Sequence, residues 1–172
     1  MVVINSGHVI IDNAWLWRAD HSVSGLVRNG DNFVESGIVV NGDNLISYGL
    51  AVEHTLGDMA VFNGDNAKVY FYQSEYPYDV TSDYASKGHV GYKVASGVNT
   101  HEAWGVGVYS YFRDHEVNMG TGISTPAKSG IKFHSSLSRF LNGFGSIQHV
   151  VNSLGGSSRA GAELNYVCEL SL

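Results

Sequence analysis

The chain has 172 residues, a formal net charge of −6 and only 15% charged residues. This length fits one domain, and an acidic balance with no run of Lys or Arg argues against a nucleic-acid-binding surface. No apolar run approaches the ~20 residues of a membrane-spanning helix, so no membrane span is expected. The N-terminal residues lack the basic and apolar regions of a signal peptide. A single cysteine, Cys168, excludes a disulfide within the chain.

Composition predicts short strands joined by tight turns, since glycine is abundant at 21 and proline is scarce at 2. The apolar run at 8–12 predicts the first strand, and alternation over 15–20 predicts a continuation. We assign Trp15, Trp17 and Ala19 to the interior. This alternation then leaves Leu16, Arg18 and Asp20 on the opposite face.

Further strands are expected along the rest of the chain, over 38–40, 45–54, 68–75, 92–95, 106–113, 135–140, 146–151 and 162–170. Polar, turn-rich segments predict loop excursions near 22–36, 76–92 and 118–130. Insertions of this kind on a repeat scaffold usually line the binding side. No linker or charge block divides the chain, so residues 1–172 are expected to form a single domain.

An internal repeat predicts how these strands stack. The tetrapeptide Asn-Gly-Asp-Asn at 41–44 returns at 63–66, 22 residues later, and a third copy stands at 29–32. The same shift places Glu53 on Glu75, and an offset of 33 overlays 17–21 on 50–54. Such periods are typical of solenoids, in which each coil buries its apolar side against its neighbours. We therefore predict an all-β fold, a right-handed parallel β-helix of about five to six coils, with Trp17, Leu50 and Tyr72 in one inward column.

Acid–His or related pairs recur along the proposed column of coils. Their positions are Asp20-His21, Glu53-His54, Glu75-Tyr76, Asp114-His115 and Gln148-His149. One end of this stack has no evident polar cap, and an uncapped β-helix end presents open backbone groups. Pairing with a second copy or with another chain is therefore an expectation for the N-terminal end.

Paired carboxylates on adjacent coils indicate glycoside chemistry. Strands one coil apart are separated by ~4.8 Å, and glycosidases use two carboxyls ~5–5.5 Å or ~6.5–9.5 Å apart. We predict Glu53, Glu75 and Glu102 as catalytic residues. Residues expected to bind substrate are Asp20, His54, Gln73, Tyr76, His101, Trp104, Tyr109, Arg113 and Asp114. Four aromatic residues, Tyr76, Tyr78, Trp104 and Tyr109, are expected to stack on sugar rings, and the His101-Glu102 pair to lie in a sugar cleft.

Two other interpretations of the same residues stay open, and a third is set aside. The column could bind a glycan without turnover, or it could be a polar ladder that solvates one face. A zinc site built from His21, His54, His115 and His149 was weighed, but no close-spaced ligand motif such as H-E-x-x-H occurs. We therefore predict no metal and no cofactor, and no G-x-S-x-G motif indicates a nucleophilic serine.

Four segments, 13–21, 48–55, 70–79 and 101–109, resemble the C-terminal portion of large secreted β-helix proteins of the pectate-lyase-like and exo-β-1,3-glucanase-like group. The resemblance spans roughly residues 7–168. It implies an extracellular, secreted protein that acts on polysaccharide, as a glycoside hydrolase-like module cleaving or binding a glucan-type glycan. The alternative is a non-catalytic structural or adhesion module that pairs with other chains.

Overall fold

The computed structural model describes residues 1–22, 25–28 and 30–171 and shows an all-β chain. The one helix among these residues is α1 (Ser82–Ser86). No described helix has the length and apolar character that crossing a bilayer would require. The prediction of an all-β fold with stacked parallel strands is confirmed.

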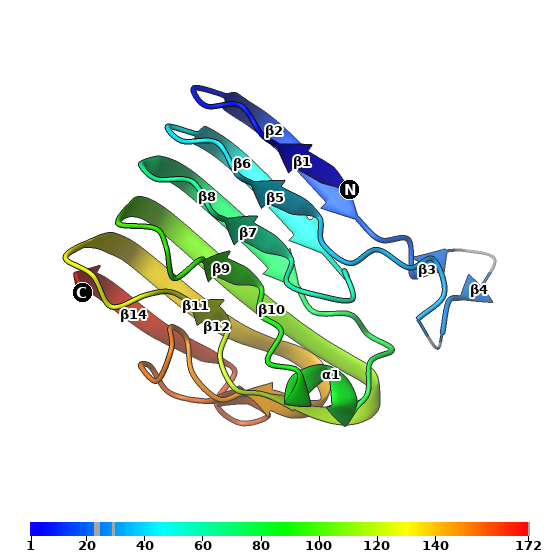
Figure 1. The fold of residues 1–172 in the computed structure, drawn as a ribbon. Coiled ribbons are helices and arrows are strands. Elements are labelled where there is room, and N and C mark those ends of the chain that lie inside the picture. The colour runs from blue at the N-terminus through cyan, green and yellow to red at the C-terminus, as the bar shows by residue number, and fades with distance from the viewer. Residues whose placement is uncertain (23–24, 29, 172) are drawn as a thin grey trace.

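Two sheets of parallel strands face each other (Figure 1). The five-stranded sheet contains β1 (Val2–Ile4), β5 (Ile38–Val40), β7 (Ala60–Phe62), β9 (Tyr92–Val94) and β11 (Ile123–Ser124). The longer strands of the other sheet are β2 (Ile10–Trp17), β6 (Ile46–Glu53), β8 (Ala67–Glu75), β10 (Thr100–Met119) and β12 (Gly130–Ile147). Each passage of the chain adds one strand to the short sheet and the next strand to the long sheet.

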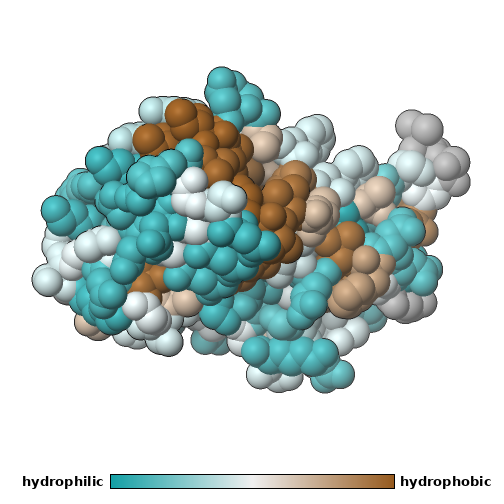
Figure 2. Space-filling model, turned by 45° about the horizontal axis from the view of Figure 1, so that its top comes forward, coloured by the Kyte–Doolittle hydropathy of each residue, from teal (hydrophilic) through white to brown (hydrophobic). Residues whose placement is uncertain are grey.

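The two ends of this stack differ. At the C-terminal end, β13 (Ser158–Arg159) and β14 (Leu164–Ser171) pair with β12 in the antiparallel sense. At the other end, β1 pairs with β5 and β2 with β6, and each lies at an edge of its sheet. Exposed hydrophobic residues of these two edge strands are Val2, Val3, Ile10 and Trp15. Figure 2, in which this end is turned toward the viewer, shows hydrophobic side chains gathered amid hydrophilic ones.

The predicted loop segments contain short elements. A hairpin of β3 (His21–Ser22) and β4 (Gly25–Leu26) begins the first segment, helix α1 lies in the second, and β11 lies in the third. The third copy of the tetrapeptide, at 29–32, begins at a residue outside the described part of the chain. The two other copies stack directly, because Asn63 donates its side-chain amide to Asn41 at 2.8 Å.

Strand register confirms the 22-residue repeat and corrects the other offset. Glu53 of β6 is paired in parallel with Glu75 of β8. However, Trp17 of β2 pairs with Glu53, and Ala14 pairs with Leu50. The true offset between β2 and β6 is therefore 36 residues, as in the pairing of Ile10 with Ile46. The inward column contains Leu50, Tyr72 and Val106, and the placement of Trp17 in it was wrong.

A column of left-handed residues explains why the faces of β2 were assigned wrongly. Each long strand has a residue with positive φ at the same register position: Asn13 (φ 53°), Gly49 (62°), Phe71 (64°), Gly105 (65°) and Ser135 (56°). Such a residue kinks the strand, so that alternation restarts after it. Trp15 is consequently exposed, whereas Arg18 and Asp20, assigned to the outside, are buried.

The interior between the sheets is a continuous apolar core. Leu50 is 1% exposed, Val106 is fully buried, and the hydroxyl of buried Tyr72 donates to the carbonyl of Gly91 at 2.7 Å. The predicted inward direction of Leu50 is confirmed. Because the kink turns the rest of each long strand, the side chains that leave the core there project from the outer face of the long sheet. The candidate site lies on that surface.

Candidate active site

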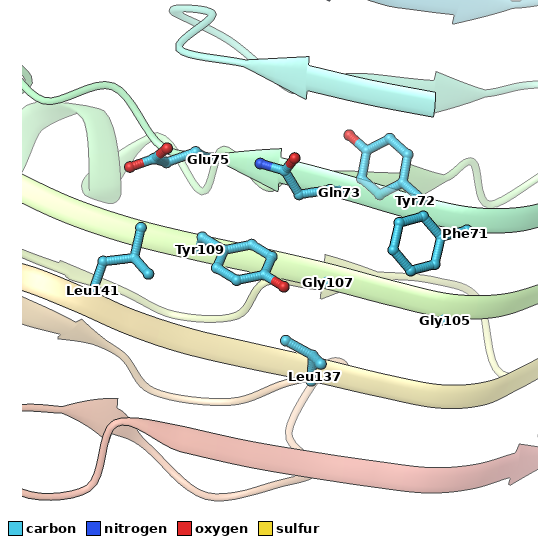
Figure 3. Close-up of a pocket in the computed structure, with 9 residues that line it drawn as sticks. All are labelled: Phe71, Tyr72, Gln73, Glu75, Gly105, Gly107, Tyr109, Leu137 and Leu141. Atoms are coloured by element: carbon cyan, nitrogen blue, oxygen red, sulfur yellow. The ribbon is translucent and has the colours of Figure 1, made fainter. Parts of the chain in front are cut away.

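A cavity of about 450 Å³ opens on the outer face of the long sheet, just beyond the kinks (Figure 3). Its lining comes from three neighbouring strands: Phe71, Tyr72, Gln73 and Glu75 of β8, Gly105, Gly107 and Tyr109 of β10, and Leu137 and Leu141 of β12. The wall is thus mostly apolar, with one carboxyl and one amide. Of the predicted site residues, Gln73, Glu75 and Tyr109 line it.

Glu53 and Glu75 are next to each other but differ in their bonding. The two carboxylate oxygens of Glu53 accept hydrogen bonds from Trp15 Nε1 at 2.9 Å and Gln73 Nε2 at 2.7 Å. Glu75 Oε1 is buried and has no hydrogen-bond partner among the described residues. Glu75 therefore keeps an uncommitted oxygen at the cavity, whereas Glu53 is held in place.

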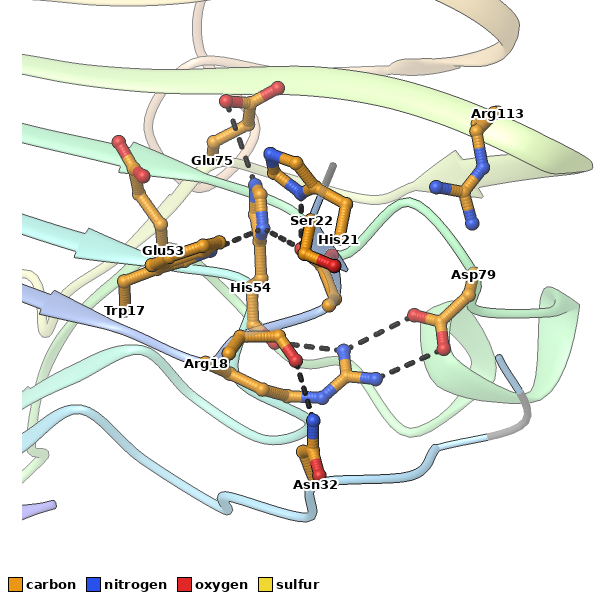
Figure 4. Close-up of polar contacts among 12 residues, drawn as sticks. Trp17, Arg18, His21, Ser22, Asn32, Glu53, His54, Glu75, Asp79 and Arg113 are labelled. Atoms are coloured by element: carbon orange, nitrogen blue, oxygen red, sulfur yellow. Dashed lines mark hydrogen bonds and ion pairs between the residues drawn. The ribbon is translucent and has the colours of Figure 1, made fainter. Parts of the chain in front are cut away.

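His54 connects Glu75 to a second buried acid (Figure 4). Its Nε2 lies 3.6 Å from Glu75 Oε2, and its Nδ1 lies 2.7 Å from Asp20 Oδ1. A carboxylate can only accept, so Nδ1 carries a hydrogen and donates it to Asp20. Burial lowers the pKa of His54, but the hydrogen bonds and charges of Asp20 and Glu75 outweigh it and raise this pKa to about 9. His54 is therefore an imidazolium at neutral pH.

The pKa of Asp20 shifts in the complementary direction. Burial raises it, but hydrogen bonds and charge from His54 and then His21 outweigh burial, and the pKa lies below its ordinary value. The Nδ1 of His21, which is partly exposed, also lies 2.7 Å from Asp20 Oδ1. Asp20 is thus an ionised carboxylate shared by two imidazoles.

A buried ion pair between Arg18 and Asp79, which was not predicted from the sequence, supports the backbone beside this cluster. Arg18 binds Asp79 through two contacts, at 3.2 and 3.0 Å, and both side chains are buried. The same guanidinium donates to the backbone carbonyl of His54 at 3.2 Å. A charged residue directly after an apolar strand was the available signal, but the wrong face assignment placed Arg18 in solvent.

Tyr78 and two charged residues border the cluster. The Tyr78 ring lies 4.3 Å from the His54 ring, centroid to centroid, and the Arg113 guanidinium lies 5.6 Å from the Tyr78 ring. Burial first, then the charge of Glu75, raises the pKa of Tyr78. Arg113 binds its neighbour Asp114 through two hydrogen bonds of 2.8 Å. Asp114 also pairs with Arg28 at 2.6 Å, so both of these predicted substrate-binding residues are engaged in ion pairs.

Two predicted sugar-binding residues lie in the core instead. Tyr76 is buried and its hydroxyl donates to the carbonyl of Thr121 at 3.0 Å. His101 is buried against Tyr92, whose hydroxyl lies 2.6 Å from Nε2, and burial lowers the pKa of His101 to about 3. Their predicted contacts with sugar are wrong, because alternation on each side of the kink directs both inward.

Glu102 and Trp104 lie before the kink of β10, away from the cavity. Glu102 Oε1 is 3.1 Å from His134 Nε2, and the Glu102 backbone pairs with Lys68 and Lys132. Trp104 is stacked between Tyr70, at 4.5 Å, and His134, at 5.1 Å. Neighbouring rings cover both faces of Trp104, so the predicted stacking on sugar is wrong. Glu102 is not brought together with Glu53 and Glu75.

The predicted histidine column does not form. His115 is exposed within β10, and His149, beyond β12, lies 3.2 Å from the carbonyl oxygen of Gly155. Only Asp20, His21 and His54, within the described chain, place three possible metal-ligand atoms within 4.8 Å of one another. Tyr109, not Asp114, continues the register of Glu53 and Glu75 on β10.

Residues 1–75 match the family described as the LAM55 pectate lyase-like domain. The chain is 40% identical over 170 residues to an exo-β-1,3-glucanase of Streptomyces sp. (strain SirexAA-E / ActE), covering 90% of this chain and 26% of that protein. It thus spans about a quarter of that relative's length.

Two solved structures of sacteLam55A from Streptomyces sp. SirexAA-E superpose closely. One is a glutamate-to-alanine variant in complex with glucose, with a TM-score of 0.91, 35% identity and coverage of 98% of this chain and 31% of that one. The other has a TM-score of 0.90, 36% identity and coverage of 98% and 32%. Residues 1–75 are thus similar to the LAM55 pectate lyase-like domain, and nearly the whole chain is similar to part of an exo-β-1,3-glucanase.

Proposed function

We propose that the chain is a right-handed parallel β-helix that supplies the acid–base residues of a secreted, β-1,3-glucan-acting glycoside hydrolase. One observation carries this proposal. Glu75 lines the cavity with an unpaired, buried oxygen, directly beside a second carboxyl, Glu53, on the adjacent strand. Two neighbouring carboxyls with different environments are what glycoside cleavage requires.

The two carboxyls take different roles in this proposal. Glu75 donates a proton to the glycosidic oxygen in this proposal, because its side chain lines the cavity and one of its oxygens has no hydrogen-bond partner among the described residues. Glu53 is the second carboxyl, held by Trp15 and Gln73 so that its charge stays in one place. Fixed charges of this kind stabilise the positive charge that develops on the sugar ring.

Shape and surface chemistry of the cavity support a sugar ligand. A volume of about 450 Å³ lies within the range of small-molecule sites. Phe71, Leu137 and Leu141 provide apolar walls for the C–H faces of a sugar ring, and Tyr109 adds an aromatic surface. A glucan is too large to enter a cell, which supports an extracellular location.

Glu75→Gln tests the proposal directly. We expect this variant to lose glucose release from a β-1,3-glucan while its glucan affinity stays within a few-fold, because the amide keeps the shape and loses the proton. Glu169→Gln, at an exposed glutamate that contacts His134, is the matched control. Reducing-sugar release and titration calorimetry measure the two quantities. Unchanged turnover in Glu75→Gln would contradict the proposed role.

A non-catalytic module that pairs with other chains is the second candidate. The open edges of β1 and β2, with exposed Val3 and Ile10, favour it. Sedimentation at increasing concentration would show association through these edges. Absence of any product from the parent chain, together with such association, would favour this second function.

A further inference from the structure

We propose that His54 is a positioning residue for Glu75: held through Nδ1 by Asp20, it presents its Nε2–H to the Glu75 carboxylate and stabilises the charge left when Glu75 gives up its proton. This inference rests on the proposed role of Glu75 as proton donor. It gives a role in catalysis to the buried pair of Asp20 and His54, neither of which needs to contact the sugar.

Hydrogen-bond geometry defines the direction in which the His54 ring acts. Asp20 occupies Nδ1 at 2.7 Å, which leaves Nε2 as the only ring nitrogen available to Glu75. Nε2 has no hydrogen-bond partner among the described residues and lies 3.6 Å from Glu75 Oε2. Catalytic hydrogen bonds are often long before substrate binds and shorten in the reacting complex. A displacement of well under 1 Å would complete this one.

The protein holds the backbone of His54 as firmly as its ring. His54 has a φ of 61°, a left-handed conformation that a histidine adopts at a cost. Its carbonyl accepts from Arg18, which is itself bound to Asp79, and all three residues are buried. Tyr78 packs on the ring. Such a conformation persists only where the surroundings over-determine it, and they do so beside the proposed proton donor.

Charges around the ring favour the imidazolium. Asp20, from the segment after β2, and Glu75, from β8, contact it directly. A third acid, Glu53, is the last residue of β6 and directly precedes His54 in the chain. Arg18, the cation nearby, is paired with Asp79, and His21 shares the same oxygen of Asp20 with His54. The pKa of about 9 at His54 agrees with this arrangement.

The proposed step conserves atoms and charge. The O–H bond of Glu75 breaks as its proton moves to the glycosidic oxygen, and the bond from that oxygen to the anomeric carbon breaks. The leaving sugar departs as an alcohol, Glu75 becomes a carboxylate, and the anomeric carbon carries the positive charge, while His54 keeps both ring protons. A water oxygen then bonds to the anomeric carbon, and the proton that this water loses returns to Glu75. A cation interacts more strongly with the carboxylate than with the neutral acid, so His54 favours the transition state over the ground state.

A metal ion on Asp20, His21 and His54 is the competing interpretation of the same residues. Ligand atoms of a tetrahedral zinc site lie about 3.3 Å apart, given metal–ligand distances near 2.0–2.1 Å. Both histidine nitrogens instead lie 2.7 Å from one oxygen, a hydrogen-bond distance.

Nuclear magnetic resonance titration of the His54 ring tests the coupling without requiring turnover. We expect Glu75→Gln and Asp20→Asn each to lower the proton affinity of His54 tenfold or more relative to the parent chain. His134, which faces Glu102 and Glu169, should titrate alike in all three proteins. An unchanged His54 titration in Glu75→Gln would overturn the proposal. So would a shift of both His21 and His54 signals that saturates at one equivalent of Zn²⁺.

Kinetics then separate positioning from simple structural support. Asp20→Asn is nearly isosteric, and its thermal unfolding verifies that it folds. We expect the alkaline limb of its kcat profile, which reports loss of the Glu75 proton, to move to higher pH because the cation that favours the Glu75 carboxylate is weakened. His54→Gln should lose about 100-fold in kcat with KM within a few-fold. A limb that stays in place would contradict positioning by His54. If the parent chain releases no glucose at any pH, the proposed function fails, whereas the ring titration still decides whether His54 and Glu75 are coupled.

Discussion

His54, Asp20 and Glu75 are ionisable groups in or near the interior, and the charges of His54 and Asp20 depend on each other. A lone buried charge is costly, and it is tolerated when an opposite charge and hydrogen bonds face it. The shared oxygen of Asp20 supplies this for two imidazoles, and Arg18 does so for Asp79. The cluster therefore stores a pH-dependent part of the folding free energy.

Stability should fall as pH rises through the folded-state pKa of His54. This pKa is raised from 6.5 to about 9, so its contribution is fully present below pH 6.5 and is lost as pH passes 9. Its size is on the order of 3 kcal/mol. Urea unfolding at several pH values between these limits should show this fall in the parent chain and a flatter curve in Asp20→Asn. Equal slopes in the two proteins would contradict the assignment.

Single residues were predictable from the sequence only where strand register alone placed them. The 22-residue repeat predicted that Glu53 lies beside Glu75. Gln73 could be placed near them because it lies two positions before Glu75 on the same strand. The side on which Arg18 and Tyr76 lie could not be obtained in this way. It depends on where each strand kinks, and the kink residue is not always a glycine.

The kinked long strand is the element that creates the cavity. Gly49 and Gly105 adopt positive φ without cost, and Asn13 tolerates it. Phe71 does not, yet it has the same conformation, is 73% exposed and lines the cavity. An unfavourable backbone conformation of a bulky residue at a ligand site is typical of functional strain. Strict alternation, which guided the sequence prediction, cannot reveal such a column.

The stacked turns between the two sheets impose a second constraint on sequence. A Cβ atom at Gly64 would lie 2.2 Å from the carbonyl oxygen of Gly42 in the preceding turn, whereas one at Gly97 would meet nothing within 4 Å. We expect Gly64→Ala to lower the free energy of unfolding by at least about 2 kcal/mol. Gly97→Ala should change it by less than about 0.5 kcal/mol. Chemical denaturation measures both, and similar losses would show that the turns are not in contact.

At the scale of the molecule, successive turns share one core that is closed at one end. Antiparallel β13 and β14 cover β12, while β1 and β2 keep open edges. The repeat predicted the all-β stack because each short strand pairs with the strand of the next turn. It could not predict the antiparallel strands at the C-terminal end, since those residues do not repeat and pair in the opposite direction.

A shared core makes the loss of one inward side chain a property of the whole stack. Leu50 is 1% exposed and lies in register with Tyr72 of the next strand. We expect Leu50→Ala to lower the free energy of unfolding by about 2–5 kcal/mol, because the cavity left behind cannot be refilled from the paired strands on either side. Equilibrium urea denaturation measures this loss.

Leu154→Ala removes the same atoms at a leucine that is 42% exposed, outside the named strands, and is the matched control. Its loss should stay below about 1 kcal/mol, since solvent can fill the space that the side chain leaves. The two variants therefore differ in position rather than in chemistry. A loss below about 0.5 kcal/mol for Leu50→Ala, or equal losses for both leucines, would show that the column through Leu50 does not support the stack.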